Sequence, residues 1–360
     1  MRGVRGCVKS VVDIRPVDRA FFQRKLDRFV PDRVVDIHTH VWQKTEQTKR
    51  RRGHDPRLVS WPSRVADENP VEHLQETYRQ FLPGRRVVPL MFATVPSGND
   101  LMRQNAYVAA CARRTGYPAL VFSDPAWSAE ELERRVKAGG FLGAKSYLSM
   151  VPAVIPGREI RIFDFFPPHQ LEVHDRNGWV VMLHIPRDAR LRDPVNLHQL
   201  MEIERTYRRL KLIVAHVGRA YANEDVGDAF DVLAGSRRMC FDICANTHAG
   251  VFEQLIRCVG AKRILFGTDL PITRMRMRRI TKAGHYINLV PRGMYGDVSG
   301  DSHMAELQGK AAERLTVFMY EEIEAFRRAA ERTGLSRGDV EAVFWKNAVR
   351  LLTGAGYRGW

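Results

Sequence analysis

The chain has 360 residues, of which 44% are hydrophobic, and this is enough for a large buried core. No apolar run approaches the roughly 18 residues of a membrane span, the N-terminus lacks the apolar centre of a secretory signal, and the five cysteines form no CxxC pair. A cytoplasmic protein without a membrane partner is expected. The net charge of +16 is spread along the chain, which favours an arginine-rich surface over a nucleic-acid partner.

Eight short apolar runs recur along the chain. Their continuous apolarity is typical of parallel strands buried on both faces. Amphipathic helix patterns lie between most of them, and the first begins at Ser128 with Glu131 three residues later, as in a capping box. The alternation predicts an α/β fold, a (β/α)8 barrel, with a doubly wound open sheet as the main alternative. The runs are 33–40, 86–95, 118–124, 140–148, 179–185, 211–217, 239–245 and 263–269, and the helix patterns are 128–139, 196–209 and 251–260.

Two regions interrupt the alternation. Residues 149–178 contain four prolines and residues 271–304 are rich in Arg, Gly and Met, so both are expected to be long loops at the substrate end of the barrel. The tail over 309–352 predicts one long helix and a shorter one. We expect an N-terminal extension over 1–30 and a single barrel domain over 31–354.

The sequence VVDIHTHVW places two histidines, His38 and His40, at the end of the first run. Residues i and i+2 of a strand point to the same face, so both imidazoles project together. The carboxyl end of a barrel strand is the active-site end. A buried pair of this kind is satisfied either by a metal ion or by hydrogen bonds to neighbours, and the pair alone leaves both open.

Other strand ends repeat the pattern. His184 lies near the end of the fifth run and His216 near the end of the sixth, Asp269 ends the eighth, and Lys145 comes late in the fourth. A buried ionisable group costs several kcal/mol unless it is paired or bound to a metal. Such groups at the ends of five strands therefore indicate a shared site.

In this order, the histidine pair, lysine, two further histidines and aspartate resemble the amidohydrolase superfamily. The resemblance is closer to its amidohydrolase-related branch, which holds metal-dependent hydrolases and nonoxidative decarboxylases. It extends over about residues 20 to 354. The segments that carry it are RFVPDRVVDIHTHVW (28–42), LIVAHVGRA (212–220), RILFGTDLP (263–271) and WKNAVRLLTG (345–354).

The resemblance implies a distorted (β/α)8 barrel with a C-terminal helical extension and one or two divalent ions. His38, His40, His184 and Asp269 would bind metal, with His216 beside them as an acid or base. Zinc is the first choice, and Mn, Fe or Co are alternatives because nitrogen and oxygen donors accept all of them. The ion would lower the pKa of water to roughly 7, and Asp269 would accept the water proton.

Lys145 leaves three alternatives open. It could be carboxylated and bridge two ions, its ammonium could bind a substrate carboxylate, or it could extend to solvent without a role. Tyr147 lies two residues later on the same predicted strand face and could add a hydroxyl to the site.

Several weaker candidates surround this set. Arg219 could bind an anionic group of the substrate or form a surface ion pair. Trp42 could form the floor of the pocket or pack within its loop. Asp242 faces inward or outward depending on a register that the sequence does not reveal. The basic runs 49–52 and 274–279 could attract an acidic substrate or lie in solvated loops.

The leading functional hypothesis is a metal-dependent hydrolase. It would cleave an amide, a lactone or a related C–N or C–O bond of a small, anionic substrate. A nonoxidative decarboxylase or hydratase of an aromatic or unsaturated acid is the alternative. Decarboxylases of this branch often carry Glu in place of the first histidine, so His38 favours hydrolysis. A homodimer is a family-based expectation.

Overall fold

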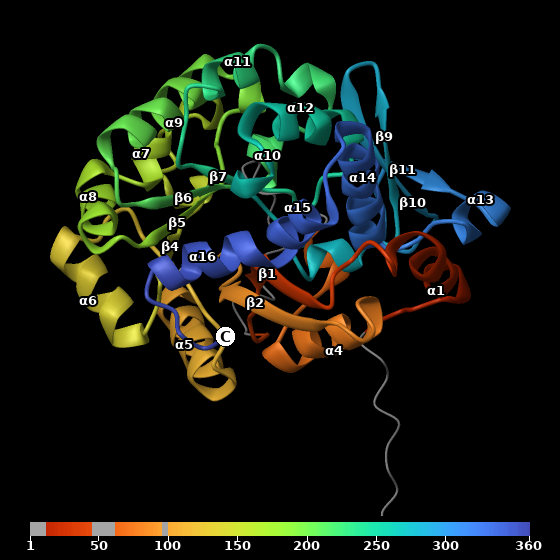
Figure 1. Ribbon diagram of the computed structural model, residues 1–360, viewed down its shortest axis with the longest axis horizontal. Helices are drawn as coiled ribbons and strands as arrows, with labels where there is room; N and C mark the ends of the chain where they lie inside the picture. The colour runs from red at the N-terminus through yellow and green to blue at the C-terminus, as the bar shows by residue number, and fades with distance from the viewer. Residues whose placement is uncertain (1–11, 45–61, 96–99) are drawn as a thin grey trace, which may run out of the picture.

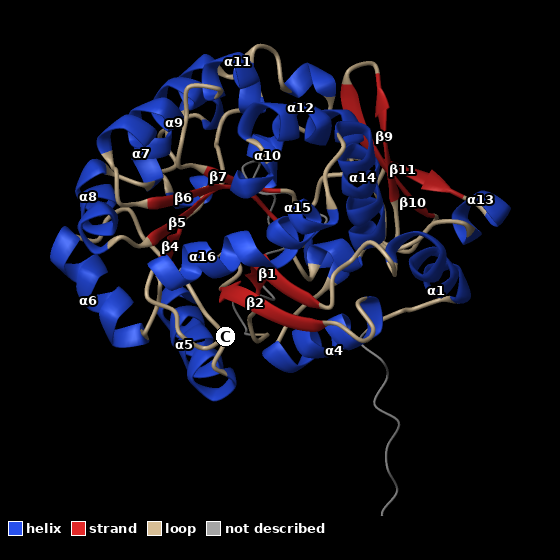
Figure 2. Ribbon diagram, viewed as in Figure 1, coloured by secondary structure: helices blue, strands red, loops and turns tan. Residues whose placement is uncertain are grey.

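Eight parallel strands form in the eight predicted runs. The structure, a computed structural model, describes residues 12–44, 62–95 and 100–360. The strands lie at the centre, with helices around them (Figure 1, Figure 2). The strands are β1 (Arg33–His40), β2 (Arg86–Phe92), β3 (Val121–Phe122), β4 (Gly143–Lys145), β5 (Val180–Leu183), β6 (Lys211–Val214), β7 (Cys240–Asp242) and β8 (Ile264–Leu265).

The strands close into a barrel. β1 pairs with β2, and β3 to β8 pair in chain order. Main-chain hydrogen bonds bridge both remaining seams, from Leu120 to Met91 (2.9 Å) and from Ile37 to Phe266 (3.0 Å). Because no free edge remains between β8 and β1, the (β/α)8 barrel is confirmed and the open sheet is excluded.

Helices cover the outside of the barrel and follow the strands along the chain. Those of the barrel are α4 (Val71–Phe81), α5 (Leu101–Thr115), α6 (Ala129–Gly139), α7 (Ile162–Phe165), α8 (Pro168–Asn177), α9 (Pro194–Thr206), α11 (Ala229–Leu233) and α12 (Ala249–Val259), whereas α10 (His216–Arg219) is a short turn of positive φ directly after β6. The others are α1 (Pro16–Phe21), α3 (Pro62–Val65), α13 (Gly309–Glu313), α14 (Phe318–Thr333), α15 (Arg337–Glu341) and α16 (Asn347–Gly354), with π-helical turns at Phe22–Leu26 and Ala342–Lys346.

The predicted helix over 128–139 is α6. The Ser128 side chain accepts a hydrogen bond from the Glu131 amide (3.2 Å), and Gly140, at φ +68°, ends the helix. The Glu131 carboxylate bonds to Arg135 instead of returning to Ser128, so half of the capping box forms. The helix predicted from 196 begins earlier, at Pro194, because the Asp193 side chain caps its first amides.

The barrel interior is apolar at the amino ends of the strands. Val35 and Ile37 of β1 pack there with Leu90, Met182 and other fully buried side chains. Each such side chain contributes about 1.5–3 kcal/mol through burial. The C-terminal helix α16 lies across this end of the barrel and adds Leu352, so the tail closes the bottom (Figure 1).

The two expected long loops are partly regular. The prediction for 271–304 was wrong, because β9 (Arg278–Lys282) and β10 (His285–Pro291) form an antiparallel hairpin and β11 (Met304–Leu307) joins it in a three-stranded sheet. The hairpin turns at Ala283 and Gly284, which both have positive φ. Residues 149–178 contain the helices α7 and α8. Two of the four prolines lie at the N-cap and the first position of α8, where proline is compatible with a helix because no intrahelical hydrogen bond from its nitrogen is required.

Within the described ranges, no helix combines the length and the apolar character that crossing a membrane requires.

Candidate metal centre

A bulge in β1 turns the histidine pair into the barrel. Asp36 pairs with Pro89 of β2, but three residues later Thr39 pairs with Met91, so β1 holds one extra residue. Ile37 already faces the apolar interior, and the extra residue allows His38 to face inward as well. The rings of His38 and His40 lie 5.6 Å apart, as the i, i+2 spacing predicted.

Three donor atoms converge at the carboxyl end of the barrel. The Asp269 Oδ1 atom lies 3.2 Å from Nε2 of His40 and 3.6 Å from Nε2 of His38. One ligand atom from each of the three buried side chains falls within 4.8 Å of the others. Two imidazole nitrogens and a carboxylate oxygen suit a divalent transition metal.

The other nitrogen of each imidazole is already occupied. Nδ1 of His38 lies 2.9 Å from Oδ2 of the buried Asp242, and Nδ1 of His40 lies 2.9 Å from the carbonyl oxygen of Ala93. Both partners are acceptors, so both Nδ1 atoms carry the proton. Each Nε2 therefore presents a lone pair toward Asp269, which is the tautomer that a metal ligand needs.

His216 reaches the same site through an unusual turn. Ile213 and Ala215 face the barrel interior, so strict alternation would point His216 outward. Four consecutive residues from His216 to Arg219 instead have positive φ, beginning with +57° at His216. The His216 ring comes to lie 4.9 Å from the ring of His38.

His184 lies at the edge of this set. It follows β5, and its ring is 5.3 Å from that of His216 and 4.7 Å from that of Tyr147. Its Nδ1 atom is buried without a hydrogen-bond partner. His184 belongs to neither group of potential ligands that the described residues form, so its predicted role as a ligand stays a prediction.

The second group of potential ligands contains a cysteine that the sequence analysis did not select. The Cys244 Sγ atom lies 3.1 Å from Nδ1 of His216, 3.2 Å from Nδ1 of His38 and 2.9 Å from Oδ1 of Asp242. Burial raises the pKa of this thiol, which therefore stays protonated. The signal was present: Cys240 and Asp242 of β7 and Cys244 just after it are spaced two residues apart, and Cys240 belongs to the inner cluster.

Lys145 lies inside the site, as predicted. Its Nζ atom is 3.0 Å from Nε2 of His38 and 4.7 Å from the centre of the Phe92 ring. Gly143 makes this placement possible, because its φ is +145° and a Cβ atom there would lie 2.0 Å from the Val180 carbonyl oxygen. Burial lowers the pKa of Lys145, so the free amine is more accessible than in an ordinary lysine.

Electrostatics keep the imidazoles neutral. Burial lowers the pKa of His38, His184 and His216, because a protonated ring would lose its hydration. Burial opposes ionisation of Asp269, but the polar imidazoles of His40, His38 and His216 around it lower its pKa to about 2. Neutral nitrogens beside a carboxylate are the protonation states that bind a metal ion.

Two predicted substrate-binding residues are held by main-chain carbonyls. Arg219 donates from Nη1 to the loop after β5, with the shortest bond at Pro186 (2.8 Å). The indole of Trp42 donates to the Asp67 carbonyl (3.0 Å). These contacts position the loops around the site, and a role of either residue in substrate binding stays a prediction.

The basic run 274–279 does not form a solvated loop. Arg274 donates to Thr77 and Asn69, and the buried Arg276 forms an ion pair with Asp18 at 2.7 Å. The expectation of a solvated rim was therefore wrong for these residues, whose guanidinium groups connect the barrel to outer elements. The run 49–52 lies outside the described residues.

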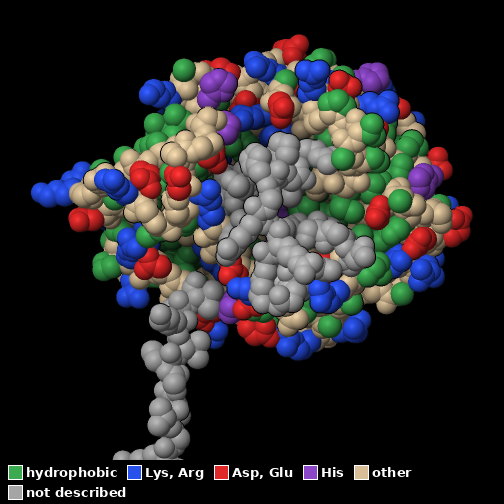
Figure 3. All heavy atoms as spheres, turned by 180° about the vertical axis from the view of Figure 1, so that it is seen from behind, with side chains coloured by type: hydrophobic (Ala, Val, Ile, Leu, Met, Phe, Trp, Pro, Cys, Tyr) green, Lys and Arg blue, Asp and Glu red, His purple; other side chains and the backbone are tan. Residues whose placement is uncertain are grey.

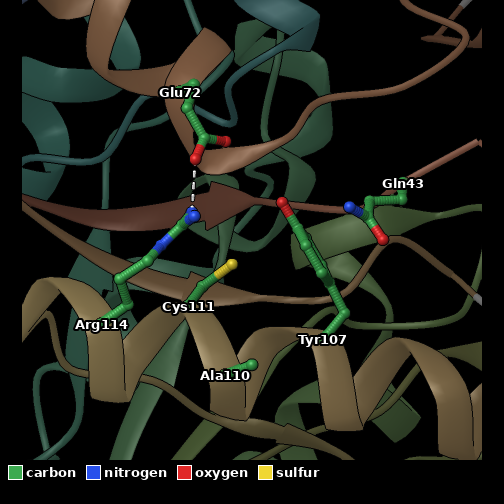
Figure 4. A pocket seen from close by; sticks show the side chains of 6 residues that line it. All are labelled: Gln43, Glu72, Tyr107, Ala110, Cys111 and Arg114. Atoms are coloured by element: carbon green, nitrogen blue, oxygen red, sulfur yellow. Dashed lines mark hydrogen bonds and ion pairs between the residues drawn. The ribbon is translucent and has the colours of Figure 1, made fainter.

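A hollow of about 190 Å³ lies beside the barrel, between α4 and α5, and none of the predicted site residues lines it (Figure 4). An ion pair between Glu72 and Arg114 spans it, with Cys111 and Tyr107 beside the pair. The histidine cluster therefore remains the candidate site.

The family model described as amidohydrolase matches residues 35–353. The chain belongs to the amidohydrolase family. The match spans all eight strands and most of the C-terminal helices. No curated protein matches this amidohydrolase significantly in sequence.

Solved structures resemble this amidohydrolase in fold. An amidohydrolase from Burkholderia multivorans, with bound HEPES, is 14% identical over 89% of this chain and 99% of its own, with a TM-score of 0.56. Another structure from that organism, with bound zinc, is 12% identical over 89% and 99%, with a TM-score of 0.55. The 5-carboxyvanillate decarboxylase of Sphingomonas paucimobilis is 14% identical over 90% and 99%, with a TM-score of 0.54. Identities this low support the barrel fold alone.

Proposed function

We propose that this amidohydrolase is a metal-dependent hydrolase that cleaves an amide, lactone or related C–N or C–O bond of a small anionic substrate. The observation that carries the proposal is the convergence of two Nε2 lone pairs and a carboxylate oxygen, from His38, His40 and Asp269, at one point of the barrel mouth. Packing alone gives no reason to bury these groups together.

The donor set fits a divalent ion. The Nδ1 atoms of His38 and His40 each face a hydrogen-bond acceptor, which leaves their Nε2 atoms free for a metal ion. The Nδ1 atom of His184 is buried and has no hydrogen-bond partner among the described residues. We propose that His38, His40 and Asp269 hold the ion, with His184 as a further ligand and zinc as the first choice. When bound, a divalent ion supplies a Lewis acid that polarises a substrate oxygen and acidifies water.

The residues of the chain would carry the proton. As water adds to the substrate carbonyl carbon, an oxygen of Asp269 accepts the water proton and passes it to the leaving nitrogen or oxygen as that bond breaks. The Nδ1 atom of His216 faces the Cys244 carbonyl and carries the proton, so its Nε2 atom presents a lone pair that can accept a hydrogen bond or a proton from the substrate. The Lys145 ammonium, in the carboxylate-binding alternative, would hold the acidic group beside His38.

A cationic and aromatic cluster at the barrel mouth supports an anionic substrate. The Arg279 guanidinium lies 4.6 Å from the Tyr286 ring and 4.8 Å from the Tyr221 ring. Arg279 bonds to the Ala245 carbonyl and to Asn288 and has no ion pair with any described carboxylate. A partly exposed guanidinium without a carboxylate partner can bind one from a substrate.

Decarboxylation or hydration is the second candidate. The decarboxylase of the preceding comparison and the 4-oxalomesaconate hydratase of Rhodopseudomonas palustris, which is 15% identical over 89% of this chain and 96% of its own with a TM-score of 0.53, share the barrel. Lys145 and Arg279 would bind the carboxylate of an aromatic or unsaturated acid equally well, and His216, after taking up a proton at Nε2, would deliver it to the substrate carbon.

The first experiment is metal analysis of the purified protein, with an expectation of about one or two ions per chain. Asp269→Asn should lower activity at least about 10²-fold on any substrate found, because it removes a ligand and the proton acceptor together. Asp228→Asn is the matched control, since Asp228 is exposed and belongs to neither group of potential ligands that the described residues form. A metal-free wild type that still turns over substrate would contradict the proposal.

Isotope labelling separates the two reactions. Carboxylate-bearing amides, lactones and aromatic acids are screened in H₂¹⁸O. Hydrolysis places one ¹⁸O in the new acid or hydroxyl, and hydration places it in a single product without cleavage. Decarboxylation releases CO₂ and leaves the organic product unlabelled, and that result would replace hydrolysis by the second candidate.

A further inference from the structure

A strongly basic pocket lies at the amino ends of β6, β7 and β8. We call it the basal pocket, lined by side chains from segments 208–211, 237–240, 262–263 and 347–351. These segments precede three adjacent strands or belong to α16, whereas the histidines lie at the opposite ends of the strands. Its volume is about 340 Å³, within the range of roughly 300–1,000 Å³ that is common for small-molecule sites.

The lining of the basal pocket is uniform in charge. It includes eight lysine and arginine residues and no aspartate or glutamate. The visible face in Figure 3 is different, because acidic and basic side chains are mixed around its outer part. Eight like charges around one hollow repel each other, and this repulsion is relieved when an anion enters.

Little within the protein neutralises these charges. Among the described residues, Arg208, Arg209 and Arg237 form no ion pair, and all three are exposed. Two carboxylates border the pocket. That of Glu204 lies 3.7 Å from Arg238 and accepts main-chain hydrogen bonds, and that of Asp175 accepts from the main-chain amides of Arg209 (2.6 Å) and Leu210 (2.9 Å). Two carboxylates that are already bonded leave most of the positive charge uncompensated.

Two of the cations are held in place by the fold. Arg263 donates from Nη1 to the Ser236 hydroxyl (2.7 Å), and Lys211 donates to the Gly178 carbonyl (2.5 Å). Burial lowers the pKa of Lys211, and the positive charge of Arg209 lowers it further. The floor of the pocket is thus pre-organised, and its rim consists of freely exposed arginines.

We propose that the basal pocket binds a compact polyanion, an oligophosphate chain. Arginine forms paired hydrogen bonds with phosphate oxygens, and several guanidinium groups around one hollow match several phosphates in a row. The only apolar side chains in the lining are Leu210, Cys240 and Leu351, so the pocket offers no aromatic ring on which a nucleobase could stack. This composition favours the phosphate chain itself over a nucleoside or nucleic acid.

The test is calorimetric titration of the intact protein with inorganic tripolyphosphate at about 0.15 M salt, where diffuse surface attraction is screened. We expect saturable binding of one molecule per chain. The double variant Arg209→Gln and Arg237→Gln should weaken binding at least about tenfold, because charge-assisted hydrogen bonds are lost. Both side chains are exposed, so folding should be unaffected.

The control variant removes the same charge elsewhere. Arg314 and Arg328 are exposed and lie outside the pocket, and Arg314→Gln with Arg328→Gln should retain wild-type binding. Asp269→Asn should also retain it, which separates this site from the proposed activity. No saturable binding, equal weakening in both double variants, or binding of single-stranded RNA at least as tight as that of tripolyphosphate would overturn the proposal.

Discussion

Asp242→Asn tests whether the protein orients His38 as a metal ligand. Oδ1 of Asp242 accepts from the His216 amide at 2.7 Å, and Oδ2 accepts from Nδ1 of His38 at 2.9 Å. An asparagine that keeps the bond to the His216 amide must turn its NH₂ group toward His38. The ring would then be favoured in the tautomer with the proton on Nε2, which removes the lone pair that faces Asp269.

Loss of a carboxylate behind a ligating histidine lowers metal affinity about 10–100-fold, or about 1.4–2.7 kcal/mol. We expect this loss when zinc is titrated against a chelating dye. Asp225→Asn is the control, because Asp225 is buried and bonded to main-chain amides and Arg190 but contacts no imidazole. Equal affinity in Asp242→Asn and wild type, or an equal loss in both variants, would refute the orientation of His38 by Asp242.

Three further predictions concern stability and packing. Burial lowers the pKa of His174 from 6.5 to about 3, so the folded state keeps this ring neutral and the free energy of unfolding falls as the pH drops below 6.5. In His174→Phe the decrease in the free energy of unfolding between pH 8 and pH 5, measured with urea, should be about 2 kcal/mol smaller than in the wild type. In Gly267→Ala the new Cβ would lie 3.0 Å from Cβ of His38, and the displaced ring should weaken zinc binding about tenfold in the same dye assay. Arg276→Met leaves the carboxylate of Asp18 buried and unpaired, and should cost about 3–5 kcal/mol in urea unfolding.

Each of the three has a contrary outcome. A pH dependence unchanged by His174→Phe would mean that this ring is not the group responsible. Wild-type zinc affinity in Gly267→Ala would show that β1 and β8 tolerate closer contact than their spacing indicates. A loss below about 1 kcal/mol in Arg276→Met would mean that the Asp18 carboxylate finds another partner or water.

The sequence predicted the barrel well because its strands are buried on both faces. Continuous apolar runs identify such strands even when the pairing register between neighbouring strands is unknown. Ionisable residues late in a run then identify the carboxyl end of the strand. This logic brought His38, His40 and Asp269 to one place and put Lys145 beside them.

The same logic could not predict how the side chains reach the centre. Strict alternation fails in three strands: at the bulge before His38, at Gly143 before Lys145, and at the positive φ of His216. Each irregularity depends on contacts with a neighbouring strand, which no local pattern contains. The hairpin within 271–304 escaped prediction for a related reason: β9 is mostly exposed and β10 alternates buried with partly exposed residues, so neither strand is a continuous apolar run.

Backbone strain at the mouth of the barrel argues that its geometry serves binding. His216, Ala245 and Asp269 all have positive φ, at +57°, +50° and +61°, although none is glycine. Each such residue costs on the order of 1–3 kcal/mol and persists only where surrounding contacts hold it. Buried carboxylates provide those contacts: Asp242 accepts from the His216 amide, and Glu322 accepts from the Ala245 amide at 2.7 Å. Tight packing alone would favour relaxed turns, so the strained turns indicate that the fold gives up stability to aim the side chains of His216 and Asp269 at a common point.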